Sequence, residues 1–233
     1  MRIRWRCPAW AVLSLALLSG MPALANTSRV ELPNGDVYEG EIRNETRTGV
    51  GTYLWRNGHR YTGEFLDNRM HGQGTYFWPD GRTYTGRFLE DRREGPGTMQ
   101  WPNGNRYEGD FVDGARAGLG TYHWRDGTVY RGEFAGDRMH GYGVKQLPDG
   151  DRELQQWREG ELIDSRPLRE VLNCRLVIDG RPWMFESSEC INGLAHGQGL
   201  AASLDGDGVV PDGRFVLGRM VEGKVRPLRH GGA

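Results

Sequence analysis

The sequence predicts an all-β protein, a single-layer antiparallel meander of tandem 23-residue β-hairpins with a small, degenerate β-rich C-terminal part. Two observations lead to this fold class. A 23-residue segment recurs five times without gaps over residues 38–152, and such self-similarity is typical of repeat architectures. Glycine supplies 36 of 233 residues while aromatic residues reach 10%, a pairing that disordered chains do not show. Four glycines recur in each unit, so the glycine excess belongs to the repeat.

Each unit has the pattern of a β-hairpin. In the second unit, apolar residues alternate from Tyr61 to Phe65, as in a strand with one packed face. Gly74 to Trp78 forms the predicted return strand, and Asp67 to Gly72 is the polar turn between them. The Pro-Asp-Gly segment after Trp78 has the residues that a turn requires and links the unit to the next. The sequence therefore predicts a continuous meander.

The repeated residues resemble those of the MORN family, the "membrane occupation and recognition nexus" repeat. Tyr opens every unit, a Trp ends the return strand of four units, and a glycine begins the return strand. These structural repeat residues are Tyr38, Tyr61, Tyr84, Tyr107, Tyr130, Trp55, Trp78, Trp101, Trp124, Gly51, Gly74, Gly97, Gly120 and Gly143. The resemblance implies an elongated, twisted sheet that mediates binding, not catalysis. Met99 departs from the pattern in the third unit, as do Lys145 and Leu147 in the fifth, which we therefore expect to be an end unit.

Large side chains are expected to cover the mid-strand glycines, which would otherwise weaken the strands. Our hypothesis is that a residue of the neighbouring strand, such as the Trp, lies over each of them. The Tyr and Trp residues should form ladders on one face, as the core or, alternatively, as an exposed groove for a peptide or glycan. The opposite face, with Glu39, Glu64 and Arg131 among its residues, is expected to be solvated.

Residues 1–25 have the pattern of a signal peptide. Three arginines precede an apolar stretch from Ala9 to Leu18, and the small-x-small site predicts cleavage after Ala25. An uncleaved anchor helix is the alternative. The predicted localisation is periplasmic or secreted. The remaining chain has 27 Lys and Arg (30 minus 3) against 31 Asp and Glu, a net charge of −4, which argues against nucleic acid and against simple electrostatic adhesion to anionic lipid.

The flanking segments extend the same pattern. Residues 26–37 are predicted to form an N-terminal capping strand, and residues 153–233 a degenerate repeat and C-terminal hairpin region. We expect Trp157 in the position of the repeat Phe, one helical turn over 168–172 and a hairpin about Asp179-Gly180. Residues 191–206 resemble a degenerate sixth unit, and 218–223 a half unit. Cys174 and Cys190 predict one disulfide in an oxidising compartment, with two free thiols as the alternative.

Patterns for catalysis or metal binding are weak in this sequence. His71, His140 and His196 occupy equivalent positions in their units, and six strands separate the first two by about 29 Å, so they cannot share a metal. The Asp-rich stretch 205–212 lacks the ligands of an EF-hand loop. We therefore predict no catalytic, cofactor or metal site.

The predicted function is an exported scaffold for protein–protein interaction in the cell envelope. A protein partner of unknown identity is expected, a membrane surface is possible, and nucleic acid is not expected. Binding of lipid headgroups or envelope glycan through an aromatic face is the alternative, and an enzymatic activity within residues 166–233 is a third hypothesis.

Overall fold

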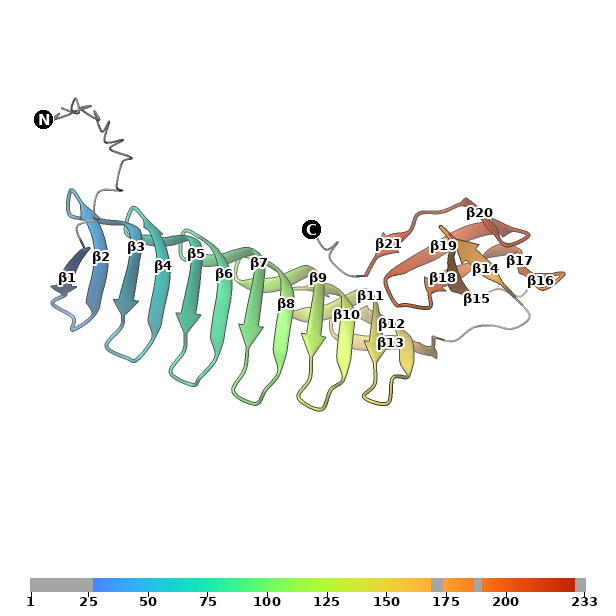
Figure 1. Cartoon of the computed structure of the whole chain (residues 1–233), viewed down its shortest axis with the longest axis horizontal. Coiled ribbons are helices and arrows are strands. Elements are labelled where there is room, and N and C mark those ends of the chain that lie inside the picture. The colour runs from blue at the N-terminus through green and yellow to red at the C-terminus, as the bar shows by residue number, and fades with distance from the viewer. Residues whose placement is uncertain (1–26, 169–173, 187–189, 229–233) are drawn as a thin grey trace, which may run out of the picture.

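The computed structural model describes residues 27–168, 174–186 and 190–228, and the predicted signal segment lies outside them. Thirteen strands follow one another as an antiparallel meander in a single sheet, the repeat array (Figure 1). At ~4.8 Å between strands, this sheet is about 58 Å across. Its strands are β1 Thr27–Glu31, β2 Val37–Arg43, β3 Thr46–Leu54, β4 Arg60–Leu66, β5 Arg69–Phe77, β6 Thr83–Leu89, β7 Arg92–Gln100, β8 Arg106–Val112, β9 Ala115–His123, β10 Val129–Ala135, β11 Arg138–Gln146, β12 Arg152–Arg158 and β13 Glu161–Pro167. The all-β meander is confirmed.

The array continues at both ends of the five units. Strand β1 pairs with β2 in front of the first unit. Strands β12 and β13 continue the meander past the fifth unit, and Trp157 lies opposite Gly141 as Phe134 lies opposite Gly118. The array thus holds six hairpins after β1.

The hairpin turns are shorter than the sequence suggested. The predicted turn from Asp67 to Gly72 consists of Asp67 and Asn68 alone, because β5 already begins at Arg69. Both residues have positive φ, 49° and 68°, as a two-residue type I′ turn requires. Asn, Asp and Gly tolerate this conformation best, and the equivalent turns hold Glu90-Asp91, Asp113-Gly114 and Gly136-Asp137.

A β-bulge in each hairpin explains the glycine that the prediction placed at the end of the turn. Gly72 has a φ of +55°, and the register between β4 and β5 shifts between Gly63 and Glu64. The Glu64 carboxylate accepts a hydrogen bond from the backbone N–H of Gln73 at 2.8 Å. Glu133 does the same for Tyr142 at 3.2 Å. These acidic residues therefore stabilise the bulge and are more than a solvated surface.

Tyrosine, not tryptophan, covers the mid-strand glycines, so our packing hypothesis was wrong in that detail. A Cβ atom on Gly86 would lie 2.5 Å from the Tyr84 hydroxyl, and one on Gly97 would lie 2.5 Å from the same ring. The ring lies across this glycine pair because Tyr84 stands two residues before Gly86 on the same face of β6. Its hydroxyl donates a hydrogen bond to the backbone carbonyl of Arg87 at 3.0 Å.

The core of the array is a continuous aromatic cluster. The five repeat tyrosines are at most 1% exposed, and Tyr61, Tyr84 and Tyr107 each pack edge-on against a Phe of their own hairpin and a Phe of the next. The Tyr61 ring centroid lies 5.1 Å from that of Phe65 and 5.0 Å from that of Phe88, both T-shaped contacts. Edge-to-face pairs at this distance stabilise a core beyond simple burial. Each unit therefore depends on its neighbours, as expected for a solenoid.

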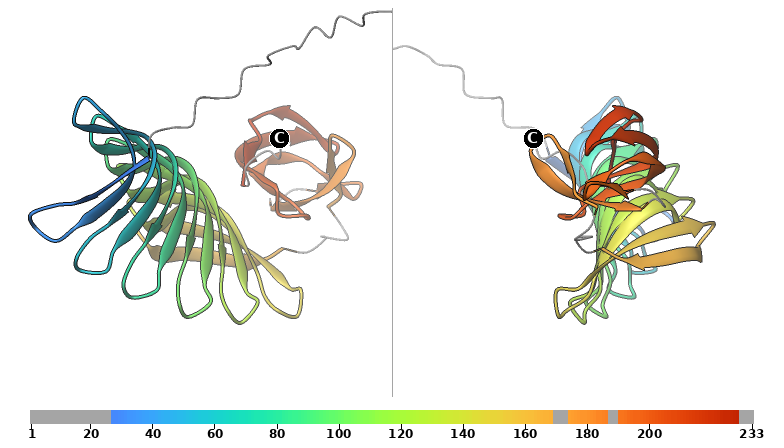
Figure 2. Two further views of the ribbon diagram at one scale, coloured as in Figure 1. Left: turned by 60° about the vertical axis from the view of Figure 1, so that its left-hand side comes forward. Right: turned by 90° about the vertical axis from the view of Figure 1, so that its right-hand side faces the viewer.

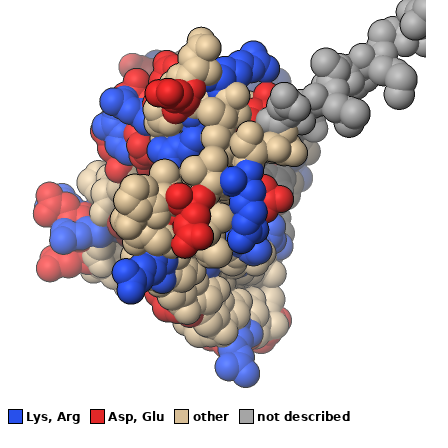
Figure 3. All heavy atoms as spheres, turned by 90° about the vertical axis from the view of Figure 1, so that its left-hand side faces the viewer, with Lys and Arg blue, Asp and Glu red and all other residues tan. Residues whose placement is uncertain are grey.

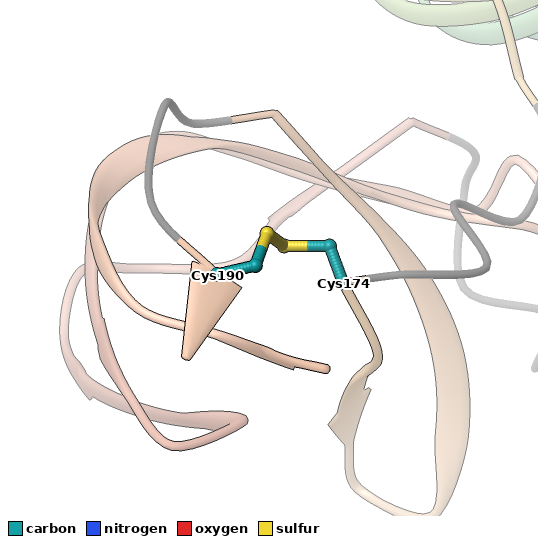
Figure 4. The surroundings of a disulfide bond; sticks show 2 residues. All are labelled: Cys174 and Cys190. Atoms are coloured by element: carbon teal, nitrogen blue, oxygen red, sulfur yellow. A yellow bond between two sulfur atoms is a disulfide. The ribbon is translucent and has the colours of Figure 1, made fainter. Parts of the chain in front are cut away.

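Residues 174–228 form a separate, smaller part, the C-terminal domain, with a six-stranded sheet and a two-stranded sheet. Its strands are β14 Leu176–Ile178, β15 Arg181–Glu186, β16 Cys190–Ile191, β17 Leu194–Ala195, β18 Gly197–Ser203, β19 Gly208–Val216, β20 Arg219–Glu222 and β21 Arg226–Pro227. Strands β16 and β17 form the two-stranded sheet. The hairpin about Asp179-Gly180 is confirmed, and the helical turn predicted over 168–172 lies almost entirely outside the described residues. A disulfide joins Cys174 to Cys190 in β16 (Figure 4), as the cysteine count predicted.

The half repeat predicted near residue 218 has the local geometry of a repeat hairpin. Phe215 pairs with Met220 across a turn at Leu217-Gly218, as Phe65 pairs with Met70. Yet β16–β21 do not extend the 13-stranded sheet, so this region is not a further unit of the array.

The C-terminal domain packs on the last hairpins of the array (Figure 2). Val144 and Leu154 of the array share a buried cluster with residues of the domain, namely Met184, Ala202, Val209 and Leu228. The Arg152 guanidinium adds a hydrogen bond to the Leu204 carbonyl at 2.7 Å. Val144, which stands where the preceding units carry Thr, therefore belongs to an internal interface, whereas Lys145 and Leu147 are not part of this cluster.

Candidate functional site: a row of aromatic pockets

The two faces of the array differ in chemistry because side chains alternate along each strand. One face, the threonine face, carries a row of cross-strand partners: Thr52, Thr62, Thr75, Thr85, Thr98, Glu108, Thr121, Arg131, Val144 and Leu154. The other, the aromatic face, carries the Tyr, Phe and Trp side chains. The last two members of the threonine row are apolar, and there the C-terminal domain covers it.

On the aromatic face, the tryptophan side chains are less buried than the repeat tyrosines. The repeat tyrosines are fully buried, whereas Trp55, Trp78, Trp101 and Trp124 are only partly buried against the core. The Trp78 and Tyr76 rings lie 4.5 Å apart, and the Trp55 and Tyr76 rings 5.4 Å apart. In the ladder predicted from the sequence, the Tyr and Phe side chains thus form the buried core, and the Trp side chains form a partly exposed edge beside it.

Three pockets line this exposed edge, and their lining residues occupy equivalent positions at intervals of 23 residues. The second pocket is lined by Arg47, Tyr53, Trp55, Phe65, Asn68, Met70 and Asp91. For each of these residues, the residue 23 positions later in the sequence lines the third pocket. The third pocket is lined by Met70, Tyr76, Trp78, Phe88, Asp91, Arg92, Arg93 and Gly114. For six of the seven, the residue 23 positions earlier lines the first pocket. The seventh such position falls outside the described residues.

The pockets are small and open, with volumes of about 260, 350 and 280 Å³ from the first to the third. In the second and third, Trp and Tyr form one wall and Phe the base. Neighbouring pockets share side chains: Arg47 lines the first and second, and Met70 lines the second and third. The pockets therefore form a continuous row, and its spacing is set by the repeat.

The position shared between pockets holds Arg47 and then Met70, and its next equivalent, in the third pocket, is Arg93. The Arg93 guanidinium carbon lies 5.7 Å from the Trp78 ring centroid and 5.3 Å from that of Phe111, within range of a cation–π interaction. Burial lowers the pKa of this guanidinium from its ordinary value, although Arg remains protonated at any physiological pH. The row thus combines aromatic surfaces with fixed positive charge.

A hydrogen-bonded clamp fixes these side chains from the next hairpin. The backbone N–H of Met70 donates to the Asp91 carboxylate at 2.8 Å, and the Asp91 N–H donates to the Met70 carbonyl at 3.0 Å. Asn68 makes the same two hydrogen bonds with Arg47, at 2.9 and 3.1 Å. Each type I′ turn therefore closes one pocket and orders the next, so the row is preorganised.

A second polar contact holds the tyrosine wall in several units. The Tyr76 hydroxyl lies 2.8 Å from His59 Nδ1, and Tyr53 donates to Asp36 at 2.7 Å. The Arg56 backbone N–H, together with Tyr53, lowers the pKa of the Asp36 carboxyl. Burial raises the pKa of the Tyr76 phenol. These contacts hold the wall residues in place at neutral pH.

The threonine face has a shallow groove of its own, with a volume of about 550 Å³. Its lining is polar and includes Gln73, Thr98 and Arg131, with strand glycines at its base. Aromatic side chains do not line it, and it is one continuous groove across several units, in which Thr85, Glu108 and Arg131 occupy equivalent positions 23 residues apart.

Of the histidines singled out in the sequence, His71 lies in β5 and His140 in β11, so the structure does not bring them together, and His196 lies between β17 and β18. Within residues 27–168, 174–186 and 190–228, no group of three or more His, Cys, Asp or Glu side chains could hold a metal ion. Over the same residues, no helix has the length and apolar character needed to span a bilayer.

The decisive comparison is with the MORN repeat family. Its model matches residues 38–60, 61–81, 84–106, 107–129 and 130–152 in succession. Residues 38–152 are MORN repeats. The family model thus confirms the resemblance on which the prediction rested, and MORN repeats are scaffolds for protein or membrane interaction. A comparison with curated proteins finds no match.

Solved structures show more distant similarity to the MORN array. The TCP domain of Drosophila melanogaster SAS-4 in complex with a proline-rich motif of Ana2 aligns at 15% identity and a TM-score of 0.32, covering 69% of this chain and 97% of that one. The TCP10 domain of Danio rerio CPAP with a STIL peptide aligns at 12% identity and a TM-score of 0.24, covering 85% and 83%. TM-scores this low say nothing about the partners of this chain.

Proposed function

We propose that this chain is an exported, non-catalytic scaffold that binds a partner protein through the pocket row on its aromatic face. One observation carries the proposal: three pockets follow one another at the 23-residue period, and hydrogen bonds from the following hairpin hold their walls. Preformed cavities that combine aromatic walls with a few fixed polar groups are typical of binding sites. A regular row of them suits an extended ligand that contacts several units at once.

Charge favours a protein partner over a lipid surface. The net charge of −4 outside residues 1–25 opposes adhesion to anionic headgroups. Basic and acidic side chains are interspersed on the β1 end of the molecule (Figure 3), without the broad basic surface that such adhesion uses. Export is supported by the pattern of residues 1–25.

Site-specific photo-crosslinking in the producing cell tests this proposal. A photoreactive amino acid at Arg92, an exposed residue of the third pocket, should yield a discrete adduct with another protein. The same group at Thr85, on the threonine face, is the matched control and should yield far less. If position 92 crosslinks to no protein, or if both positions crosslink equally, the proposed binding face is wrong.

Vesicle sedimentation tests the alternative directly. The chain should stay in the supernatant with vesicles of anionic phospholipid at 150 mM salt. Sedimentation with these vesicles that resists high salt would replace the protein partner with a membrane surface.

A further inference from the structure

The spacing of the pocket row identifies the kind of ligand that fits it. We infer that its occupant is a proline-rich segment of a partner protein in the polyproline II conformation, with every third residue in successive pockets. This inference rests on the proposed function and specifies the chemistry of the partner at the same site.

The first step is the distance between equivalent pockets. One MORN unit contributes two adjacent strands to the sheet. With ~4.8 Å between neighbouring strands, equivalent positions in successive units lie about 9.6 Å apart. The ring contacts agree with this value, because the steps from Trp55 to Tyr76 and from Tyr76 to Trp78 are 5.4 and 4.5 Å. A ligand that uses several pockets must present similar groups at this interval.

The second step compares this interval with the repeats of peptide conformations. A polyproline II helix advances about 9.3 Å in one three-residue turn, so residues i, i+3 and i+6 follow the row with an error of about 0.6 Å over three pockets. In a β-strand, side chains on one face recur at about 6.7 or 13 Å. An α-helix places i and i+7 about 10.5 Å apart and is out of step by about 1.8 Å over the same length. Polyproline II matches best.

The third step is the chemistry of the pocket walls. Trp55 with Tyr53, and Trp78 with Tyr76, present pairs of tilted aromatic rings 4.5 Å apart at the exposed edge. Proline-rich segments dock in aromatic-lined grooves because the pyrrolidine ring packs on such faces and the helix is preformed, which lowers the entropic cost of binding. A polyproline II backbone makes no internal hydrogen bonds, so its carbonyls are free to accept from donors on the rim, such as the Arg92 guanidinium.

Labelled peptides test the inference on the full chain. Fluorescence polarisation should show that a nonaproline peptide binds at least tenfold more tightly than hexaproline, and hexaproline at least tenfold more tightly than triproline, as each added turn reaches another pocket. A nine-residue Gly-Ser peptide and a nine-residue alternating Thr-Val peptide should not bind. Failure of nonaproline to bind, or equal binding of the Thr-Val peptide, would overturn the inference.

Variants and a footprint locate the binding. Trp78→Ala should weaken nonaproline binding at least tenfold, while Thr85→Ala on the opposite face should leave it unchanged. Because Trp78 also packs on the core, hydrogen exchange on the unaltered chain provides an independent measurement: nonaproline should protect the turns at residues 67–70 and 90–93. Protection confined to the threonine face would contradict the proposed site.

The outcomes separate this inference from the proposed function. If position 92 crosslinks to a protein while only the Thr-Val peptide binds, the scaffold stands and the polyproline II occupant is wrong. If nonaproline binds the row but position 92 crosslinks to no protein in the cell, the proposed function fails even though the pockets accept such a ligand.

Discussion

At the scale of single residues, the MORN unit is organised around one tyrosine and two glycines. The Tyr84 ring occupies the space above Gly86 and Gly97, and its hydroxyl bonds to the backbone at the neighbouring bulge. Strand propensity alone would not place a glycine at either position, because glycine disfavours strands. The sequence could indicate that something large covers them, but it could not decide between Tyr and Trp, since both recur with the same period.

Replacing Gly86 by valine should destabilise the array strongly. The new Cβ would meet the Tyr84 hydroxyl at 2.5 Å and the Gly97 Cα at 2.7 Å, and the backbone cannot yield as a flexible side chain would. Overpacking of this kind costs about 3 kcal/mol in the free energy of unfolding, measurable by urea denaturation. Thr85→Val, one residue earlier on the exposed face, should change it by less than about 0.5 kcal/mol. Equal stability of the two variants would contradict this packing.

The buried tyrosines should also make the array sensitive to alkali. Burial raises the pKa of Tyr84 from 10.0 to about 12, and raises the pKa of Tyr38 as well. Below pH 10 the phenol is protonated in the folded and unfolded chains alike. Above pH 10 the unfolded chain loses protons that the folded chain retains, so the free energy of unfolding should fall as the pH rises to about 12.

Circular dichroism and tyrosinate absorbance, recorded together, check this dependence: sheet should be lost as the phenols ionise. Tyr84→Phe should be less stable at pH 7, because it lacks the hydrogen bond to Arg87, yet show a shallower decline above pH 10. Ionisation near pH 10 with an intact sheet would show that the tyrosines are not buried.

At the scale of the hairpin, the type I′ turn connects neighbouring units. The sequence predicted turns in the right places but made them too long, because Gly72 was assigned to the turn and not to a bulge within the strand. A glycine with positive φ serves either purpose, so composition does not distinguish them. The clamp from turn to previous unit had no sequence signal, because the side chain–backbone bond from Asp91 to Met70 links residues 21 apart in different hairpins.

Asp91→Ala should weaken the array by about 2 kcal/mol. It removes the acceptor of the Met70 N–H and places alanine at a φ of +70°, which disfavours residues with a Cβ. Asp91→Asn is the matched control, since Asn68 already makes the same hydrogen bond in the preceding hairpin. Thermal unfolding of both variants checks this, and an alanine variant as stable as the asparagine variant would mean that the clamp contributes little.

At the scale of the whole molecule, the array was predictable and its junction with the C-terminal domain was not. The sequence periodicity predicts the array, because each strand pairs with its neighbour in the sequence and the same residues recur in register. The departures from the repeat at Lys145 and Leu147 predicted an end unit. The structure instead places Val144 in a cluster with residues 40 to 84 positions later in the chain. A periodic pattern does not predict such a contact.

The predicted export has a direct chemical consequence. The chain recovered from outside the cytoplasm should begin at Asn26, and intact-mass measurement should show Cys174 and Cys190 oxidised. Replacing Ala25 by a bulky residue such as Trp should slow cleavage of the signal peptide. Recovery of an uncleaved chain with free thiols would place the protein in a reducing compartment.

The junction itself is testable by restoring the repeat pattern at its fifth unit. Val144 stands where the other units carry Thr52, Thr75, Thr98 or Thr121, so Val144→Thr keeps the strand but places a hydroxyl in the shared cluster. Burying that group without a partner should destabilise the contact by about 1–2 kcal/mol. Compared with the original chain, hydrogen exchange should then be faster in residues 200–210 of the C-terminal domain and unchanged in β4–β7. The reciprocal change, Thr121→Val on the uncovered part of the row, should leave exchange in both regions unaltered. If both variants exchange like the original chain, the domain is not held to the array through Val144.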